Sequence, residues 1–290
     1  MIKKFTLSFL FIALLASCVS DAPPTATTWD GNEISYISKG NGQLSVVFIH
    51  GWCANKSYWE NQIEALSKKH RVVALDLAGH GESSGRRKHW TPENFSKDVV
   101  AVVRELNLKQ VVLVGHSVAE DVLIRASRML PERTVAIVGI ENFKNTGIEM
   151  TDSLRGEVNR FFRLVAYDYK GSAKAFAYDQ LLIPGMDPKV RGRILRDVVE
   201  ADTSISVPIL RGLFEDFELE KSFLKEMIVP LHLINSSYRP TDTTHLKKFC
   251  PNGFSFTEID SCGHYPMLER PAELNKKLEA VLAEIAANKS

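Results

Sequence analysis

Several features that mark particular protein classes are missing from this 290-residue sequence. It has no long basic run, and its 36 Lys and Arg residues are balanced by 35 Asp and Glu residues. A nucleic-acid groove needs a basic patch or stripe, so we expect no nucleic-acid partner. No internal repeat, metal-ligand spacing or phosphate-binding glycine loop is visible. We therefore expect neither a bound metal nor a cofactor.

Cysteine is also scarce, with 4 residues in the chain. Cys250 and Cys262 flank a predicted strand of about six residues, which spans roughly 20 Å, whereas the Cα atoms of a disulfide lie within about 7 Å. Cys53 lacks the surroundings of a thiol-protease nucleophile, and we interpret it as a packing residue. We expect no disulfide framework.

An apolar run long enough to span a membrane is absent as well. Residues 1–17 contain two lysines, a short apolar run and small residues, which is the layout of a secretory signal. Leu15-Ala16-Ser17-Cys18 resembles the bacterial lipobox, in which the cysteine is lipidated and becomes the first residue of the mature protein. We predict export to the bacterial cell envelope, a lipid anchor at Cys18 and a tether over residues 18–27. An ordinary cleaved signal is the alternative.

What the sequence does contain is an alternation of strand and helix patterns. A hairpin is predicted at Asp30-Gly31, and apolar strands then alternate with amphipathic helices, which favours a mostly parallel central sheet flanked by helices. This rhythm covers residues 28–144 and resumes over 228–290. Residues 145–227 show only helical patterns with many aromatic residues, and we predict that they form an inserted helical cap.

The stretch from Val111 to Val122 predicts a strand, a turn around Ser117 and the start of a helix. The G-x-S-x-G signature of such a turn has glycine where this chain has Ala119. Small residues are needed there because the backbone passes close by, and alanine adds only a methyl group. We therefore predict Ser117 as a nucleophile, with a helix N-cap serine as the alternative. The following Glu120 either compensates the helix dipole or intrudes on the packing of the turn.

Four motifs in order give the chain, from about Thr28 to Ala287, a resemblance to α/β-hydrolases with a helical cap. They are His50-Gly51-Trp52, Asp76-Leu77-Ala78-Gly79-His80-Gly81-Glu82-Ser83, Gly115-His116-Ser117-Val118-Ala119 and Cys262-Gly263-His264. The resemblance implies that His264 is the general base, since it follows the last strand, and that the amides of Trp52 and Val118 form the oxyanion hole. Trp52 can serve in addition as a wall of the pocket.

The acid of the triad departs from the commonest pattern. That pattern places an aspartate soon after the seventh strand, but the first acid there is Asp242, which lies beyond a proline at the start of a predicted helix. Some relatives carry the acid after the sixth strand, where this chain has Glu141. A charge directly after so apolar a strand is explained by a buried partner such as His264. We predict Glu141 as the acid, with Asp242 as the second choice.

These residues together predict a serine hydrolase that cleaves a carboxylic ester or similar acyl substrate through an acyl-enzyme intermediate. A serine at this position sets the chain apart from relatives with an aspartate nucleophile, the epoxide hydrolases and haloalkane dehalogenases. C–C bond hydrolases and aminopeptidases of the same fold remain alternatives. So does a non-catalytic envelope protein that uses the fold to bind a ligand. The expected partners are a small-molecule acyl substrate and, through the lipid anchor, a membrane.

Overall fold

The computed structural model describes residues 23–144, 146, 149–215, 221–222, 224–250 and 252–288. The predicted signal peptide and lipidation site at Cys18 lie outside the described residues. Within the described part, no helix combines the length and apolar character needed to cross a bilayer.

Eight strands form one sheet in the order β1-β2-β4-β3-β5-β6-β7-β8. β1 and β2 are joined by the predicted turn at Asp30-Gly31, and β2 pairs antiparallel with both β1 and β4. Every other pair is parallel, as the unbroken apolar strands predict. The strands are β1 (Thr25–Thr27), β2 (Glu33–Lys39), β3 (Leu44–Ile49), β4 (Arg71–Leu75), β5 (Gln110–His116), β6 (Thr134–Ile140), β7 (Leu231–Ser236) and β8 (Phe254–Ile259).

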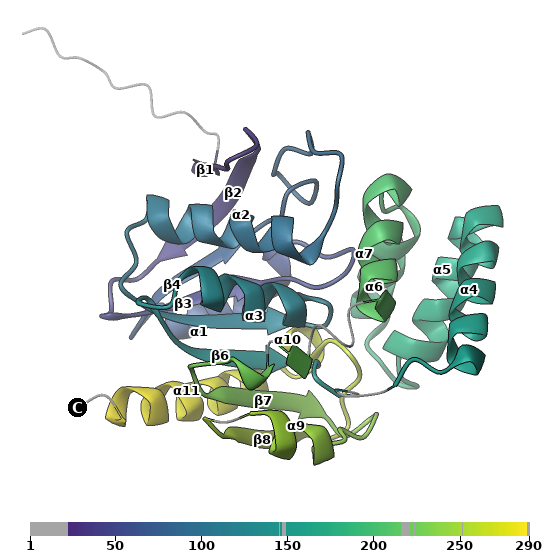
Figure 1. The fold of residues 1–290 in the computed structure, drawn as a ribbon. Coiled ribbons are helices and arrows are strands. Elements are labelled where there is room, and N and C mark those ends of the chain that lie inside the picture. The colour runs from purple at the N-terminus through teal and green to yellow at the C-terminus, as the bar shows by residue number, and fades with distance from the viewer. Residues whose placement is uncertain are drawn as a thin grey trace, which may run out of the picture.

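Helices cover both faces of the sheet (Figure 1). Successive side chains of a strand point to opposite faces, so in β3 Val46 and Phe48 belong to one hydrophobic core and Val47 and Ile49 to the other. The first core is completed by α1 (Glu60–Leu66), α10 (Pro266–Glu269) and α11 (Pro271–Ala287). The second is completed by α2 (Pro92–Glu105), α3 (Ala119–Met129) and α9 (Thr244–Phe249).

Local signals explain where several helices begin. The Thr91-Pro92 pair is typical of a helix start, and the Thr91 hydroxyl accepts a hydrogen bond from the Asn94 N–H with Pro92 at the first position of α2. The helical spacing of Trp59, Ile63 and Leu66 predicts a helix over residues 56–69, and the structure has a 3₁₀ turn (Lys56–Trp59) followed by α1 there. The four-residue α10 was not expected from the sequence.

Between β6 and β7 the described residues contain helices and no strand. Figure 1 shows these helices together beyond the carboxyl ends of the parallel strands. Residues 145–227 are the predicted bounds of the helical cap. The helices are α4 (Asp152–Tyr167), α5 (Tyr169–Phe176), α6 (Pro188–Val199) and α7 (Thr203–Glu215), with a π-type turn at Ala177–Leu181.

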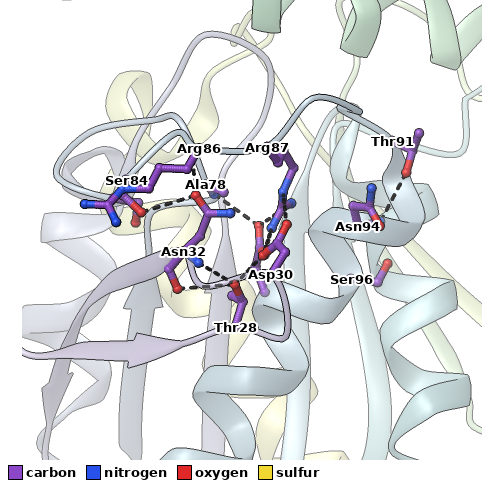
Figure 2. Close-up of polar contacts among 12 residues, drawn as sticks. Thr28, Asp30, Asn32, Ala78, Ser84, Arg86, Arg87, Thr91, Asn94 and Ser96 are labelled. Carbon is purple, nitrogen blue, oxygen red and sulfur yellow. Dashed lines mark hydrogen bonds and ion pairs between the residues drawn. The ribbon is translucent and has the colours of Figure 1, made fainter.

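A buried arginine ties the N-terminal hairpin to the loop after β4. The Arg87 guanidinium donates to Asp30 over 3.0 Å and to Asp98 on α2 over 2.6 Å. Figure 2 shows Arg87 facing Asp30, with Asn32 linked to Ser84 beside them. The composition of Arg86-Arg87-Lys88 predicts a solvated loop. For Arg87 this prediction is wrong, because its side chain is only 3% exposed and is paired with Asp30 and Asp98.

Candidate functional site

The turn that carries Ser117 is a tight connection between β5 and α3. Ser117 has φ 56, in the left-handed region, and its N–H donates to Ile140 O over 3.0 Å. A Cβ atom added at Gly51 would lie 3.1 Å from Ser117 Cβ and 2.6 Å from His116 Nδ1, so only glycine fits beside the turn. Ala119 is fully buried and begins α3. Alanine is therefore accommodated where the signature has glycine, and the strained serine stands at the tip.

His264 is held at the same edge of the sheet by its main chain. The buried His116 lies beside it, with ring centroids 4.7 Å apart, and burial lowers the pKa of His116 to about 3. A neutral ring with its proton on Nε2 donates to the His264 carbonyl oxygen, which is 2.7 Å away. Glu269 on α10 accepts from the N–H groups of Gly263 and Tyr265, each over 3.0 Å. Hydrogen bonds from His116 and to Glu269 therefore hold the main chain on either side of His264 in place.

Glu141 directly follows β6 and is the carboxylate that meets His264. Its Oε2 lies 3.2 Å from His264 Nδ1, and its Oε1 accepts from the Ser236 N–H and lies 3.1 Å from Lys144 Nζ. Burial alone would raise the pKa of Glu141, but the hydrogen bond and charge of His264, together with Lys144, hold this pKa below its ordinary value. An ionised carboxylate accepts hydrogen bonds only, so Nδ1 carries the proton that it receives.

Asp242, the second choice for the acid, lies elsewhere. Its carboxylate accepts from the Thr244 N–H over 2.9 Å at the start of α9, and its own N–H donates to Lys144 O over 3.0 Å. Asp242 does not belong to the described residues that line the cavity around Ser117. Its side chain therefore accepts from the first N–H of α9 and lies two residues before that helix begins.

The two predicted oxyanion donors line the same cavity as Ser117. Trp52 and Val118 both line the cavity, and no hydrogen bond within the described residues uses either amide N–H. The loop before Trp52 is fixed by His50, whose Nε2 accepts from the Leu77 N–H over 3.0 Å while Nδ1 faces Gly51 O over 2.9 Å. Burial lowers the pKa of His50, in keeping with a neutral ring that donates from Nδ1. The Trp52 indole N–H donates to Ser206 O on α7 over 2.9 Å, so its ring is also a wall between the core and α7.

A cavity of about 250 Å³ brings Ser117, His264 and Glu141 together. The apolar part of its lining comes mainly from α5, α7 and the turn between α5 and α6, and the polar part comes from the segments after β6 and β7, from α3 and from the same turn. The apolar lining is Trp52, Val118, Phe176, Leu181, Leu210, Leu213 and Phe214, and the polar lining includes Glu120, Asn142, Lys144, Gln180 and Arg239.

Within the described residues, His264 makes no hydrogen bond to the Ser117 hydroxyl. Catalytic hydrogen bonds are often long in structures without substrate and shorten when the substrate binds. The two side chains share the cavity, with the His264 side chain 16% exposed and Ser117 half-buried.

Glu120 contacts the segment that follows β6. Its side chain is half-buried, and its carboxylate accepts a hydrogen bond from the Phe143 N–H over 2.6 Å. The sequence suggested dipole compensation or intrusion for Glu120. Neither interpretation includes the hydrogen bond from the Phe143 N–H. The supporting contacts of Glu269 and Lys144 were also not expected, because each joins segments that sequence spacing alone does not bring together.

Comparisons with known proteins agree with this architecture. The sequence model described as the alpha/beta hydrolase family matches residues 46–277. The karrikin insensitive 2 receptor IA of Petunia hybrida is 25% identical over 244 residues, which cover 80% of this chain and 88% of the receptor. The non-heme chloroperoxidase CPO-A1 of Kitasatospora aureofaciens is 38% identical over 103 residues, 35% of this chain and 37% of that protein. The structure of an esterase from Exiguobacterium antarcticum superimposes with a TM-score of 0.77 at 17% identity, covering 90% of this chain and all of the esterase.

Proposed function

Because the chain belongs to the alpha/beta hydrolase family, we propose that it is a serine hydrolase that cleaves a carboxylic ester or similar acyl substrate. The observation that carries this proposal is the meeting of three side chains in one cavity. Ser117 stands on a left-handed turn, and His264 is hydrogen-bonded to the buried Glu141.

The proposed reaction proceeds through an acyl-enzyme. The Ser117 hydroxyl attacks the acyl carbon while His264 Nε2 accepts its proton. Glu141 keeps the other ring nitrogen protonated and stabilises the imidazolium that forms. The proton then passes to the leaving group, and a water molecule activated by His264 hydrolyses the acyl-serine.

The negative charge of the tetrahedral intermediate falls on the former carbonyl oxygen. The amides of Trp52 and Val118 are the proposed donors to it, since both line the cavity beside Ser117. Loss of one such donor costs about 3 kcal/mol of transition-state stabilisation in serine hydrolases. These donors belong to the main chain, so side-chain substitutions at 52 or 118 do not remove them.

A ligand-binding protein without catalysis is the second candidate function. The similarity to a protein named as a karrikin insensitive 2 receptor favours it, because that name describes a receptor. Labelling with a fluorophosphonate probe separates the two, since only an activated serine reacts. We expect wild-type protein to be labelled, Ser117→Ala to be unlabelled and Ser153→Ala, a change on the exposed surface of α4, to be labelled like wild type. An unlabelled wild-type protein would favour the binding function.

Esters are distinguished from the other acyl substrates by turnover. p-Nitrophenyl esters, aminoacyl p-nitroanilides and a vinylogous 1,5-diketone test an esterase, an aminopeptidase and a C–C bond hydrolase in turn. Hydrolysis of the esters alone supports an esterase. Turnover of the p-nitroanilides alone would assign the protein as an aminopeptidase, and turnover of the diketone alone as a C–C bond hydrolase.

We also propose that the protein is exported and held on a membrane of the bacterial envelope by lipid at Cys18. The support is the Leu15-Ala16-Ser17-Cys18 sequence at the end of an apolar run, followed by a short tether. An acyl anchor binds a membrane without a spanning helix.

A further inference from the structure

The loop that carries Glu141 has an unusual backbone. Glu141 and Phe143 both have left-handed φ angles, 55 and 53, and neither is glycine. Side chains with a Cβ atom occupy this region at a cost, so the surrounding contacts must hold the loop in place. From this backbone position the Glu141 carboxylate lies 3.2 Å from His264 Nδ1.

The loop makes hydrogen bonds to β7, the strand next to β6 and away from the nucleophile's strand. The Asn142 N–H donates to Asn235 Oδ1 and the Lys144 ammonium group donates to Ser236 O, and both acceptors belong to β7. Two contacts come from the nucleophile's side. The Asn142 side-chain amide donates to Gly115 O over 3.1 Å, and the Phe143 N–H donates to the Glu120 carboxylate over 2.6 Å.

The Glu120 contact joins the two parts of the proposed triad. Glu120 lies three residues after Ser117, in the first turn of α3, and Phe143 lies two residues after Glu141. The Phe143 side chain is 1% exposed and packs in the core beneath α3. A hydrogen bond from an amide to a carboxylate is shorter and stronger than one between neutral groups. Without Glu120, the Phe143 N–H would lose its carboxylate acceptor in a partly buried place.

We propose that Glu120 is a positioning residue that fixes the Glu141 loop against the nucleophile helix, so that Glu141 orients His264. This inference rests on the proposed function. It also connects two acidic residues, the proposed acid after β6 and the carboxylate three residues after the serine, because Glu120 supplies an acceptor for the backbone of the acid loop.

Two substitutions separate this role from helix-dipole compensation. Glu120→Gln removes the charge but keeps an oxygen that accepts from the Phe143 N–H, whereas Glu120→Ala removes both. We expect Glu120→Ala to lower kcat by about 10- to 100-fold with KM within about threefold of wild type, as for other changes that loosen the orientation of reacting groups. Glu120→Gln should lose less than about threefold. Equal losses in the two variants would assign Glu120 to the dipole and overturn the proposal.

A double-mutant cycle tests whether Glu120 acts through Glu141. In a Glu141→Gln background the orienting carboxylate is already absent, so adding Glu120→Ala should change kcat by no more than about twofold. A merely structural effect would lower kcat by the same factor in both backgrounds, and that result would contradict the proposal.

Hydrogen exchange tests the positioning without any turnover. In Glu120→Ala the amides of residues 141–144 should exchange at least about tenfold faster than in wild type, while those of β5 stay unchanged. In Glu120→Gln both segments should resemble wild type. Unchanged exchange at 141–144 in Glu120→Ala overturns the inference, whereas a failure of the probe to label wild-type protein contradicts the proposed function instead.

Discussion

The ring of His264 donates from Nδ1 to the Glu141 carboxylate over 3.2 Å, although 123 residues separate the two in sequence. The order of the strands in the sheet brings the two residues together. β6, which Glu141 follows, lies between the nucleophile's strand β5 and β7. Parallel strands end at a common edge, so a carboxylate after β6 faces the same cavity as Ser117.

Replacing Glu141 should therefore impair chemistry more than folding. Glu141→Gln keeps the size of the side chain but loses the ionised acceptor that sets the tautomer of His264. We expect kcat to fall by roughly 10³- to 10⁴-fold, as for the loss of a triad acid in other hydrolases. Ester turnover, with circular dichroism to confirm that the fold is retained, measures this effect.

Asp242→Asn is the matched control for the acid. The Asp242 carboxylate caps the start of α9 and lies outside the cavity lining, so its loss should change kcat less than about threefold. If Asp242→Asn were the damaging change and Glu141→Gln the mild one, the role of the acid would pass to Asp242.

The apolar side of the cavity predicts a preference for acyl chains of medium length. Pockets bind apolar groups by burying them, and p-nitrophenyl esters of graded length should give a higher kcat/KM for medium chains than for acetate. Leu213→Trp fills part of this side and should shift the optimum to shorter chains, with a loss of about tenfold or more for the longer esters. Leu164→Trp, on the exposed face of α4, should leave the profile unchanged. A flat profile in the wild type would count against an acyl pocket.

The membrane anchor makes a prediction that does not depend on catalysis. Wild-type protein should incorporate labelled palmitate and sediment with membranes, and Cys18→Ser should do neither. Cys250→Ser provides a control for the label, because Cys250 is buried in the folded protein. Absence of label in the wild type would rule out the lipobox interpretation.

Asp98 predicts how stability depends on pH. Burial raises the pKa of Asp98 to about 6, against the lowering effect of Arg87, from a reference value of 3.8. The folded chain thus binds more protons at this carboxyl between about pH 4 and 6, so its contribution to the free energy of unfolding falls as pH rises through that range.

Asp98→Asn removes this titration. Urea unfolding at pH 4, 5, 6 and 7 should show the free energy of the wild type, relative to the variant, falling by roughly 1–3 kcal/mol between pH 4 and 6 and staying level above. The contribution of Asp30 to the free energy of unfolding should instead fall as pH decreases from about 4 to 2. Burial opposes the shift, but hydrogen bonds from Thr28, Asn32 and Arg87 lower the pKa of Asp30 to about 2. Parallel curves for wild type and Asp98→Asn would contradict the role of Asp98.

The elements that local pattern determines were predictable from sequence. The Asp30-Gly31 turn and the unbroken apolar runs indicated strands that alternate with helices, and Thr91-Pro92 marks the start of α2, because burial and capping act over a few residues. The position of Glu141 followed from the same reasoning, since an acid after an apolar strand must lie at the strand's carboxyl edge.

What the sequence could not reveal depends on contacts between distant segments. The Phe143 N–H meets Glu120 only because two strand ends converge, and no periodicity encodes that meeting. The burial of Arg87 is similar, because the sequence shows a basic loop while Asp30 and Asp98 come from different elements. The short α10 was missed because four residues give no helical period.

The hydrogen bond from the Trp52 indole to Ser206 O makes one residue a member of two structural units. Its amide belongs to the loop proposed to hold the oxyanion, and its ring is fastened to α7. A displacement of α7 relative to the sheet therefore either breaks this bond or transmits force to the loop beside Ser117. In the proposed reaction, this side chain links the position of α7 to the amide that stabilises the transition state, so substitutions that alter the contacts of α7 should change KM and kcat together.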